Sequence, residues 1–412
     1  MKFDDYPITE RIKLNLEMSG FKRPTDIQFK AIPSILKGED VLAVAQTGTG
    51  KTAAFAIPIL HKLSLEIRSG KETEGVRCIV MVPTRELAMQ IAAVFNKLGK
   101  GTGVKILSLY GGVEQDRQIE RIVQGVDVLI ATPGRMFDLI YQKHLKITKV
   151  EVLVLDEADR MLDLGFYKDI LDVKKFLPTR HQTLFFSATI NDKIKDVAYS
   201  LVRNPIRIQV SPKDPVAKNI SHYIAFVEMD DKRFFLERII NSHAGSKILV
   251  FVRTKVRAER VKAAMERVGI VSETIHGDKE QTQRSEVMAD FRSGELKVLI
   301  ATDVSARGID ISDVEYVVNY DLPDVPENYV HRVGRTGRGT KKGHAVSLCS
   351  TEEIPLLENI EKYTGTRIAI LELGEKDYRQ TVDFSLDTTS SDLNALMKEV
   401  EELESRKKKK KK

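Results

Sequence analysis

Two short polar motifs, each directly after an apolar run, constrain most strongly what this chain can fold into. The first spans residues 45–52 and reads Ala-Gln-Thr-Gly-Thr-Gly-Lys-Thr, after the run Val41–Val44. The second is Asp-Glu-Ala-Asp at residues 156–159, after the run Val152–Leu155. Such apolar runs are typical of buried strands in a parallel sheet, whose carboxyl ends meet at one edge. The pair therefore predicts an α/β fold with a polar site at that edge.

The first motif has the composition of a phosphate-binding loop. Its glycines let backbone N–H groups approach phosphates, Lys51 reaches the outer phosphates, and the Thr52 hydroxyl faces Mg²⁺. Ala45 stands where the strict pattern has Gly, and a Gly-rich turn before a helix is often only a turn. The loop therefore needs the support of a second motif.

The acidic motif gives this support. Asp156 offers a carboxylate to the metal at the end of a strand, and Glu157 stands beside it to act on the attacking water. An acidic pair after an apolar run can also be a helix cap or a solvated charge. Together and in this order, the two motifs predict a site that hydrolyses a nucleoside triphosphate.

The composition is that of a globular protein with several domains. For 412 residues we expect two or three domains, and a hydrophobic content of 42% is enough for their cores. Cys78 and Cys349 are too few for a disulfide framework, which favours a reducing, cytoplasmic setting. The charged start Met1–Asp5 is unlike a signal peptide, and no apolar stretch approaches the ~18 residues of a membrane span. We therefore expect no membrane partner.

The basic charge is concentrated at the C-terminal end. The net charge is +6, but residues Arg406–Lys412 carry seven positive charges, so the rest of the chain sums to −1. Attraction of the folded part for a polyanion then has to come from local patches, with the tail as a separate basic arm. The alternative is that the lysine run only keeps the protein soluble.

Short apolar runs alternate with helical patterns in both halves of the chain. The expected strands are Val41–Val44, Cys78–Val82, Lys105–Leu109, Val128–Ala131, Val152–Leu155, Thr183–Phe186, Ile248–Val252, Val271–Ile275, Val298–Ala301, Tyr316–Val318 and Ala345–Leu348. They predict two α/β domains, residues 1–210 and 220–374, each a mostly parallel sheet flanked by helices. Pro212 and Pro215 indicate a short, fairly stiff linker at 211–219.

The second half contains no phosphate loop, as expected if its sheet domain closes over the nucleotide of the first. After it, residues 375–412 are expected to form a polar linker, an amphipathic helix and the basic tail. The apolar stripe of that helix consists of Leu393, Leu396, Met397, Val400 and Leu403. The stripe either packs on the body of the protein or mediates self-association.

Further motifs complete a family pattern. In chain order the set is Gly20–Gln28, the phosphate loop, Pro83–Ala88, Gly111-Gly112, Thr132–Arg135, Asp156–Asp159, Ser187–Thr189, Ala301–Asp310 and His331–Arg338. With these motifs the chain resembles the DEAD-box ATP-dependent RNA helicases of helicase superfamily 2 over roughly residues 3 to 365. The one visible departure is Val333, where the family usually has Ile. The resemblance implies two tandem RecA-like domains.

The resemblance also implies roles at the nucleotide. The Gln28 amide matches the N7/N6 edge of adenine, and Phe21 offers a face to the base. Phe3 is either a second aromatic contact or else a core or disordered residue. The implied ATP-binding set is Phe3, Phe21, Arg23, Gln28, Ala45, Gln46, Thr47, Gly48, Thr49, Gly50, Lys51, Thr52, Gly308 and Asp310. The implied catalytic set is Lys51, Asp156, Glu157, His331, Arg335 and Arg338, with Thr52 and Asp156 holding Mg²⁺.

For RNA, the resemblance implies contacts from both domains. The positions are Thr84, Arg85, Gly111, Gly112, Thr132, Gly134, Arg135, Arg284 and Thr302, while Ser187 and Thr189 couple the nucleotide to the RNA-binding face. These hydroxyls, guanidinium groups and small residues suit phosphates and sugars, so we expect little sequence preference. Taken singly, Arg85 could be a solvated helix start and Gly111-Gly112 an ordinary turn.

The implied activity is that of an RNA-stimulated ATPase. ATP and RNA, single-stranded or a short duplex, both favour closure of the two domains, and this closure locally unwinds the duplex. One alternative is an ATP-gated RNA clamp or annealing factor with little net unwinding. Another is a DNA translocase, against which the segment around Gln28 and the motif Thr132–Arg135 argue. The short basic tail resembles the bacterial RhlE-like branch, often tied to ribosome-assembly or RNA-decay factors; a monomer is compatible with the sequence.

Overall fold

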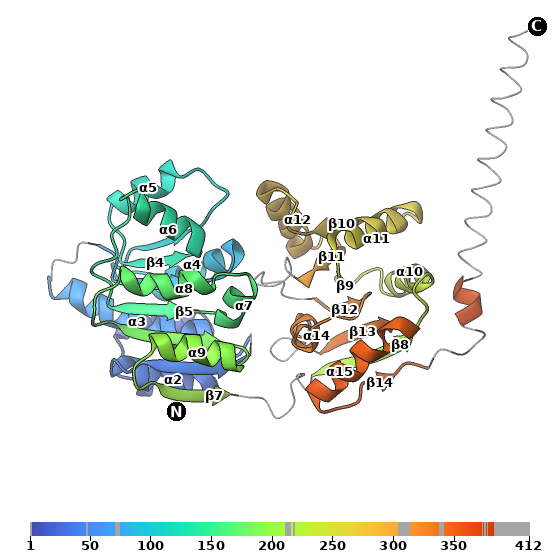
Figure 1. The fold of residues 1–412 in the computed structure, drawn as a ribbon, viewed down its shortest axis with the longest axis horizontal. Coiled ribbons are helices and arrows are strands. Elements are labelled where there is room, and N and C mark those ends of the chain that lie inside the picture. Colours follow the sequence, from blue (N-terminus) through green and yellow to red (C-terminus); the bar gives the residue numbers. More distant parts are fainter. Residues whose placement is uncertain are drawn as a thin grey trace, which may run out of the picture. The chain divides into compact units, whose positions relative to one another are not determined.

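The chain folds into two compact units, each built around its own seven-stranded sheet (Figure 1). The computed structural model describes residues 2–46, 48–70, 75–210, 216, 219–303, 314–337, 342–372, 374, 376 and 378–382. Within these residues, every paired strand of both sheets runs parallel to its neighbour. The predicted fold class, two parallel α/β domains, is therefore confirmed.

The sheet of the first unit has the order β3-β4-β2-β5-β6-β1-β7. Its strands are β1 (Val41–Ala45), β2 (Cys78–Met81), β3 (Ile106–Leu109), β4 (Val128–Ala131), β5 (Val152–Leu155), β6 (Gln182–Ser187) and β7 (Ile206–Val210). Because β1 lies between β6 and β7, the phosphate loop starts inside the sheet rather than at its margin. The acidic motif follows β5, which is paired with β6.

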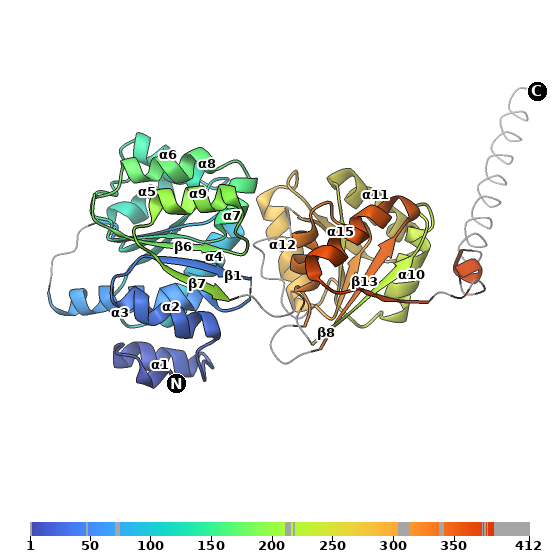
Figure 2. The ribbon, with the colours of Figure 1, turned by 60° about the horizontal axis from the view of Figure 1, so that its bottom comes forward.

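Helices cover both faces of this sheet. They are η1 (Phe3–Asp5), α1 (Glu10–Met18), α2 (Asp26–Leu36), α3 (Lys51–Arg68), α4 (Arg85–Leu98), α5 (Asp116–Val123), α6 (Pro133–Tyr141), α7 (Ala158–Asp163), α8 (Tyr167–Asp172), η2 (Val173–Lys175) and α9 (Asp192–Leu201). Figure 2 shows α6, α8 and α9 on one side of the sheet and α1, α2 and α3 on the other. Two separate apolar cores result, because successive strand residues such as Ile79 and Val80 enter opposite cores.

The second unit repeats this architecture with the strand order β10-β11-β9-β12-β13-β8-β14. Its strands are β8 (Ile220–Phe226), β9 (Ile248–Val252), β10 (Ser272–Ile275), β11 (Val298–Thr302), β12 (Tyr316–Asn319), β13 (Gly343–Cys349) and β14 (Ala369–Ile370). Its helices are α10 (Lys232–Ser242), α11 (Lys255–Arg267), α12 (Gln281–Ser293), α14 (Pro326–Val333), η3 (Thr351–Glu353) and α15 (Ile354–Thr364). Among the helices that the structure describes, none is long and apolar enough to cross a membrane.

Three strands lack the continuous apolar pattern and were not predicted. In β7, only Ile208 is buried, because this strand forms one margin of the first sheet. Strand β8 mixes buried, half-buried and exposed residues, and its neighbour β14 has only two residues, both exposed. Strands at or near a sheet margin are covered less completely, so the period of their apolar residues carries a weaker signal.

The expectation of a polar linker directly after residue 374 is wrong in part. Residues 378–382 form a helical turn, and Tyr378 and Val382 pack against the core of the second unit. The Tyr378 ring lies 4.9 Å from the ring of Phe235, and its hydroxyl donates to Asp231 Oδ2 at 2.7 Å. Two apolar contacts four residues apart were too few to stand out in a polar stretch.

Several predictions lie outside the described residues. They concern the greater part of the linker at 211–219, the apolar stripe from Leu393 to Leu403 and the basic tail Arg406–Lys412. These stay predictions.

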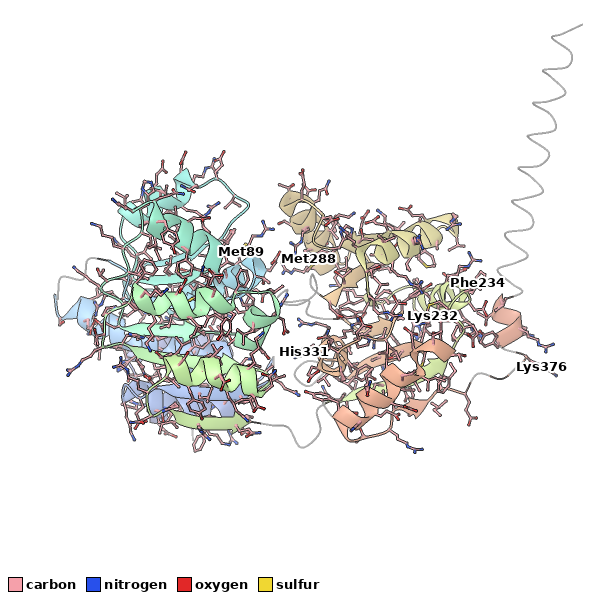
Figure 3. The ribbon with its side chains drawn as sticks, in the orientation of Figure 1. Met89, Lys232, Phe234, Met288, His331 and Lys376 are labelled. Atoms are coloured by element: carbon pink, nitrogen blue, oxygen red, sulfur yellow. The ribbon has the colours of Figure 1, made fainter. Side chains whose placement is uncertain are left out.

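The docked turn leads to a stability prediction. Tyr378→Ala should lower the free energy of unfolding of the second unit by about 1–3 kcal/mol, because it removes a half-buried ring and a hydroxyl with two hydrogen bonds. Urea unfolding of the full chain measures this loss. Lys376→Ala, at an exposed position labelled in Figure 3, is the control and should be neutral. Equal stability of the Tyr378 variant and the wild type would mean that the turn does not stabilise the unit.

Candidate nucleotide site and RNA-binding edge

The phosphate loop connects β1 to α3 and is closed by its own lysine. Gly48 and Gly50 have φ angles of 86° and 94°, in the left-handed region that favours glycine. The Lys51 side chain is buried, and its Nζ donates to the carbonyl of Ala45 at 2.8 Å. This bond uses one of the three ammonium protons, so the charge lies within the loop with further donors for a phosphate. Thr52 lies half-buried in the first turn of α3.

Gln28 joins the predicted adenine-reading segment to the phosphate loop. Its Nε2 donates to the carbonyl of Gly50 at 3.1 Å, and its Oε1 accepts from the Thr25 N–H at 3.0 Å. A Cβ atom on Gly50 would lie 2.5 Å from Gln28 Nε2, so a side chain at position 50 would displace the Gln28 amide. Gln28 Nε2 keeps one free amide proton and Oε1 keeps one free lone pair beyond these bonds. Adenine offers an acceptor at N7 and a donor at N6, which these two groups match. Sequence reasoning did not foresee this link.

The aromatic residues of the first segment have different surroundings. Phe21 is half-buried, whereas Phe3 is 4% exposed and belongs to the core. Their ring centroids are 6.0 Å apart with an interplanar angle of 79°, an edge-to-face contact. Phe3 is thus the core residue that the sequence left open as an alternative, and it supports Phe21 from below the surface. Arg23 is exposed.

Asp156 is the carboxylate that fits a metal ion. It is 3% exposed at the end of β5, and its Oδ1 accepts from the Glu157 N–H at 3.0 Å. Burial raises the pKa of Asp156 from 3.8 to about 6, and the charge of Lys51 only partly offsets this. A buried carboxylate suits Mg²⁺, which usually keeps waters and substrate phosphates as its other ligands. Thr52 remains the predicted second ligand. The described residues contain no cluster of three or more His, Cys, Asp or Glu side chains that would hold a metal alone.

Glu157 is held in a strained backbone conformation. Its φ and ψ angles are 52° and 48°, left-handed for a residue that is not glycine. Such a conformation costs of order 1–3 kcal/mol and is often found at functional sites. The guanidinium of the buried Arg160 lies 3.4 Å from Glu157 Oε2, which directs the carboxylate.

The last residue of the acidic motif connects to the predicted coupling motif. Asp159 Oδ2 accepts three hydrogen bonds, from the Ala188 N–H at 3.1 Å, the Thr189 N–H at 3.0 Å and the Thr189 hydroxyl at 3.1 Å. Ser187 is fully buried, and its hydroxyl has no hydrogen-bond partner among the described residues. Sequence reasoning assigned no role to Asp159. The only feature that could have pointed to one was its position within the acidic motif.

The predicted RNA-binding residues of the first unit gather after β2, β3 and β4. Arg85, at the start of α4, donates from Nη1 to the Gly111 carbonyl at 3.2 Å. Gly112 has a φ of 78°, and a Cβ atom there would lie 2.1 Å from Arg85 Nη1. Arg135 of α6 donates to the Val113 carbonyl at 3.1 Å. Both arginines therefore hold the loop after β3, so three motifs distant in sequence form one edge.

The other members of this edge have distinct local roles. The Thr84 hydroxyl accepts from the Leu87 N–H at 3.3 Å and caps α4. Thr132 precedes α6 as its N-cap residue, without a hydrogen bond from its side chain to the helix. Gly134 has open space where a side chain would be. The edge thus presents helix starts and small residues, which suit a phosphate backbone.

The second unit carries the remaining described candidates. Thr302 ends β11 and is buried, and Arg284 lies half-buried on α12. His331, labelled in Figure 3, lies on α14, and Arg335 follows this helix with 5% exposure. Four predicted site residues, Thr47, Gly308, Asp310 and Arg338, lie outside the described residues.

Fold and site together define a class: tandem parallel α/β domains of which the first carries a phosphate loop and an acidic strand end. Family models agree, since residues 25–197 match "DEAD/DEAH box helicase" and residues 231–340 match "Helicase conserved C-terminal domain". The ATP-dependent RNA helicase CshA of Listeria monocytogenes is 40% identical over 371 residues, 90% of this chain and 70% of that protein. The helicase RhpA of Helicobacter pylori is 39% identical, over 90% and 74% respectively.

Solved structures show the same likeness. S. cerevisiae Dbp5 bound to RNA and ADP BeF3 matches with a TM-score of 0.81 and 32% identity, over 92% of this chain and 98% of Dbp5. Mss116p bound to ssRNA and AMP-PNP matches with a TM-score of 0.82 and 27% identity, over 93% and 82%. The chain belongs to the DEAD-box family of ATP-dependent RNA helicases.

The raised pKa of Asp156 predicts how the stability of the nucleotide-free protein depends on pH. A carboxyl group with a raised folded-state pKa stabilises the fold below its ordinary pKa of 3.8, and this contribution is lost as the pH rises through about 6. Asp156→Asn should therefore be more stable than the wild type at pH 8, by on the order of 1–3 kcal/mol, with little gain near pH 4.

Thermal unfolding across this pH range, without nucleotide or Mg²⁺, measures the difference. Asp159→Asn is the matched control, because its carboxylate accepts three hydrogen bonds and the change should bring no gain. A gain for Asp156→Asn that is the same at every pH would contradict the assigned cause.

Proposed function

We propose that this chain is an RNA-stimulated ATPase that separates short RNA duplexes locally through closure of its two domains. The observation that carries the proposal is the placement of two predicted ligand sites at the carboxyl edge of one sheet. Lys51 and Asp156 follow β1 and β5, and the edge formed by Arg85, Gly111 and Arg135 follows β2, β3 and β4. The relatives' names and the bound RNA of the Dbp5 and Mss116p structures support it.

At the nucleotide, each residue has a role that its surroundings support. Lys51 binds the outer phosphates from within the loop. Gln28 selects adenine with the amide proton and the lone pair that its bonds to Gly50 and Thr25 leave free. Thr52 and Asp156 hold Mg²⁺, which, when bound, neutralises phosphate charge. Glu157, oriented by Arg160, positions or deprotonates the attacking water.

The second domain completes the catalytic set. His331 and Arg335, with Arg338, Gly308 and Asp310 outside the described residues, are proposed to contact the nucleotide. An arginine that meets the transferred phosphoryl group typically raises kcat by ~10³–10⁵. Hydrolysis is therefore slow until ATP and RNA bring the domains together, and this requirement gives the chain its switch.

RNA is recognised mainly through its backbone. Arg85 and Arg135 are held by loop carbonyls, and the accompanying positions are hydroxyls and glycines rather than readers of base edges. We therefore infer weak sequence preference. The RNA contacts of Arg284 and Thr302 in the second domain follow from the family resemblance.

Finer assignments stay proposals. Placement in the RhlE-like branch rests on the short basic tail, whereas the relatives compared here carry the names CshA and RhpA. A cytoplasmic setting, a monomeric state and work with ribosome-assembly or RNA-decay factors are inferred from the same resemblance. The tail Arg406–Lys412, outside the described residues, is proposed to tether RNA without sequence preference.

The direct test is steady-state ATP hydrolysis with and without single-stranded RNA, with DNA of the same sequence as the control. We expect strong stimulation by RNA alone, because the second-domain arginines act only after closure. Equal stimulation by DNA, or none by either, would remove the RNA-helicase assignment and leave the nucleotide site.

A duplex-separation assay in the same buffer distinguishes the clamp alternative. Sustained turnover with strand separation supports the helicase. Binding that depends on ATP, together with turnover too slow for repeated cycles, supports the ATP-gated clamp or annealing factor.

Glu157→Gln separates binding from chemistry. Loss of a general base typically costs 10²–10⁴-fold, so we expect turnover to fall by at least ~100-fold while ATP-dependent RNA binding is kept or strengthened. Turnover and RNA affinity in the presence of ATP measure the two effects. Glu120→Gln makes the same chemical change at an exposed position of α5 and should alter neither. Unchanged turnover in Glu157→Gln would refute its assigned role.

A further inference from the structure

Helix α14 presents neighbouring side chains to different surroundings. His331 is half-buried, whereas Arg332 is 1% exposed and among the largest fully buried side chains of the chain. Successive helix residues point about 100° apart, so Arg332 faces inward where His331 does not. Sequence reasoning gave Arg332 no role, although it lies in the motif His331–Arg338.

Arg332 clamps the end of β11. Its Nε donates to Asp303 Oδ1 at 2.6 Å and its Nη2 to Asp303 Oδ2 at 2.8 Å, a bidentate pair. Its Nη1 donates to Asn319 Oδ1 at 3.3 Å and to the Asp321 carbonyl at 2.7 Å. The guanidinium also lies 5.1 Å from the ring centre of Phe251. One side chain therefore ties α14 to strands β9, β11 and β12.

The two ends of this clamp adjoin two predicted sites. Asp303 directly follows Thr302, the predicted RNA contact at the end of β11. On the other side, the Arg335 N–H donates to the Arg332 carbonyl at 3.0 Å, so the turn that carries the predicted arginine finger starts from Arg332. Thr336 anchors the far side of that turn through its hydroxyl, which donates to the Val314 carbonyl at 2.6 Å.

A hydrogen-bond relay holds the same helix at a second point. Asn319 Nδ2 donates to Ser347 Oγ at 3.0 Å, Ser347 bonds the hydroxyl of Tyr329 on α14, and that hydroxyl lies 2.9 Å from His222 Nδ1. Arginine can only donate, so Asn319 has to turn its oxygen to Arg332 and its amide to Ser347. The Tyr329 hydroxyl and His222 Nδ1 end this chain of hydrogen bonds. Burial lowers the pKa of His222, which favours a neutral imidazole there.

Stability alone does not explain such an arrangement. A buried ion pair often stabilises no more than well-packed apolar residues of similar volume, because desolvation offsets the attraction. What the bidentate pair and the hydrogen-bond relay do provide is one defined geometry for α14 relative to β11 and β12.

We propose that Arg332 is a positioning residue that locks the strand end carrying Thr302 to the helix end carrying Arg335, so that RNA binding and ATP hydrolysis are coupled through α14. The inference rests on the proposed function and deepens it. Coupling between two ligands is reciprocal, so it is measured by how much an ATP analogue tightens RNA binding.

The test compares Arg332→Lys with the wild type in RNA affinity, with and without AMP-PNP, and in RNA-stimulated turnover. Lysine keeps the charge but loses the planar fork of donors. We expect RNA affinity without nucleotide to change by less than ~2-fold, whereas the tightening by AMP-PNP and the RNA stimulation fall by ~5-fold or more. Arg77→Lys is the matched control: Arg77 is likewise a buried arginine, and its Nε donates to Glu151 Oε1 at 2.8 Å. It lies directly before β2 in the first domain, outside the proposed clamp, so the change should keep both ratios.

Two further variants keep the test decisive if Arg332→Lys does not fold. Asp303→Asn changes a carboxylate that is 22% exposed, and Tyr329→Phe removes one hydroxyl from the relay while keeping its ring. Asp303→Asn should behave as Arg332→Lys does, and Tyr329→Phe should show a smaller loss of both ratios. Retention of both ratios in folded Arg332→Lys or Asp303→Asn, or an equal loss in Arg77→Lys, overturns the inference. If the wild type shows neither tighter RNA binding with AMP-PNP nor faster turnover with RNA, the proposed function is refuted instead.

Discussion

The parallel pairing of β1 with β6 and β7 is the constraint on which the nucleotide site depends. It aligns Val44 with Ser187 and Ala45 with Val210, so the strands end at one level. Since β5 also runs parallel to β6, β5 ends at the same edge, and Asp156, which directly follows it, lies there as well. Parallel strands need long connections, and here these connections are the helices and loops that carry the functional side chains.

This edge also gathers the features that cost stability. Asp156 is a buried carboxylate, Glu157 adopts a left-handed backbone, and the Ser187 hydroxyl lacks a partner among the described residues. Neighbouring contacts hold this edge: Arg160 lies 3.4 Å from Glu157 Oε2, and Asp159 accepts three hydrogen bonds from the loop after β6. Strained groups that the surrounding structure holds in place are typical of ligand-binding and active sites.

The second unit uses the same sheet differently. Without a phosphate loop, its carboxyl edge is organised by buried charges, in which Arg332 binds Asp303 and Lys232 (labelled in Figure 3) pairs with Glu353. A buried ion pair of this kind often stabilises a fold no more than well-packed apolar residues would, but losing one partner is strongly destabilising. The two domains therefore share a fold but carry different groups at their carboxyl edges: Lys51 and Asp156 in the first, and ion-paired side chains such as Arg332 and Asp303 in the second.

The sequence by itself determined the central strands and the residues within short motifs. Strands such as Val152–Leu155 are buried on both faces and so appear as continuous apolar runs, and the chemistry of Lys51 and Asp156 is local to a few residues. Only the tertiary structure decided what lies at the sheet margins and which distant groups meet. Three examples are the marginal strand β7, the bond from Gln28 to Gly50 and the clamp of Arg332 on Asp303. Each depends on a partner 22 or more residues away, and the period of apolar residues within a segment does not predict which distant residue will be that partner.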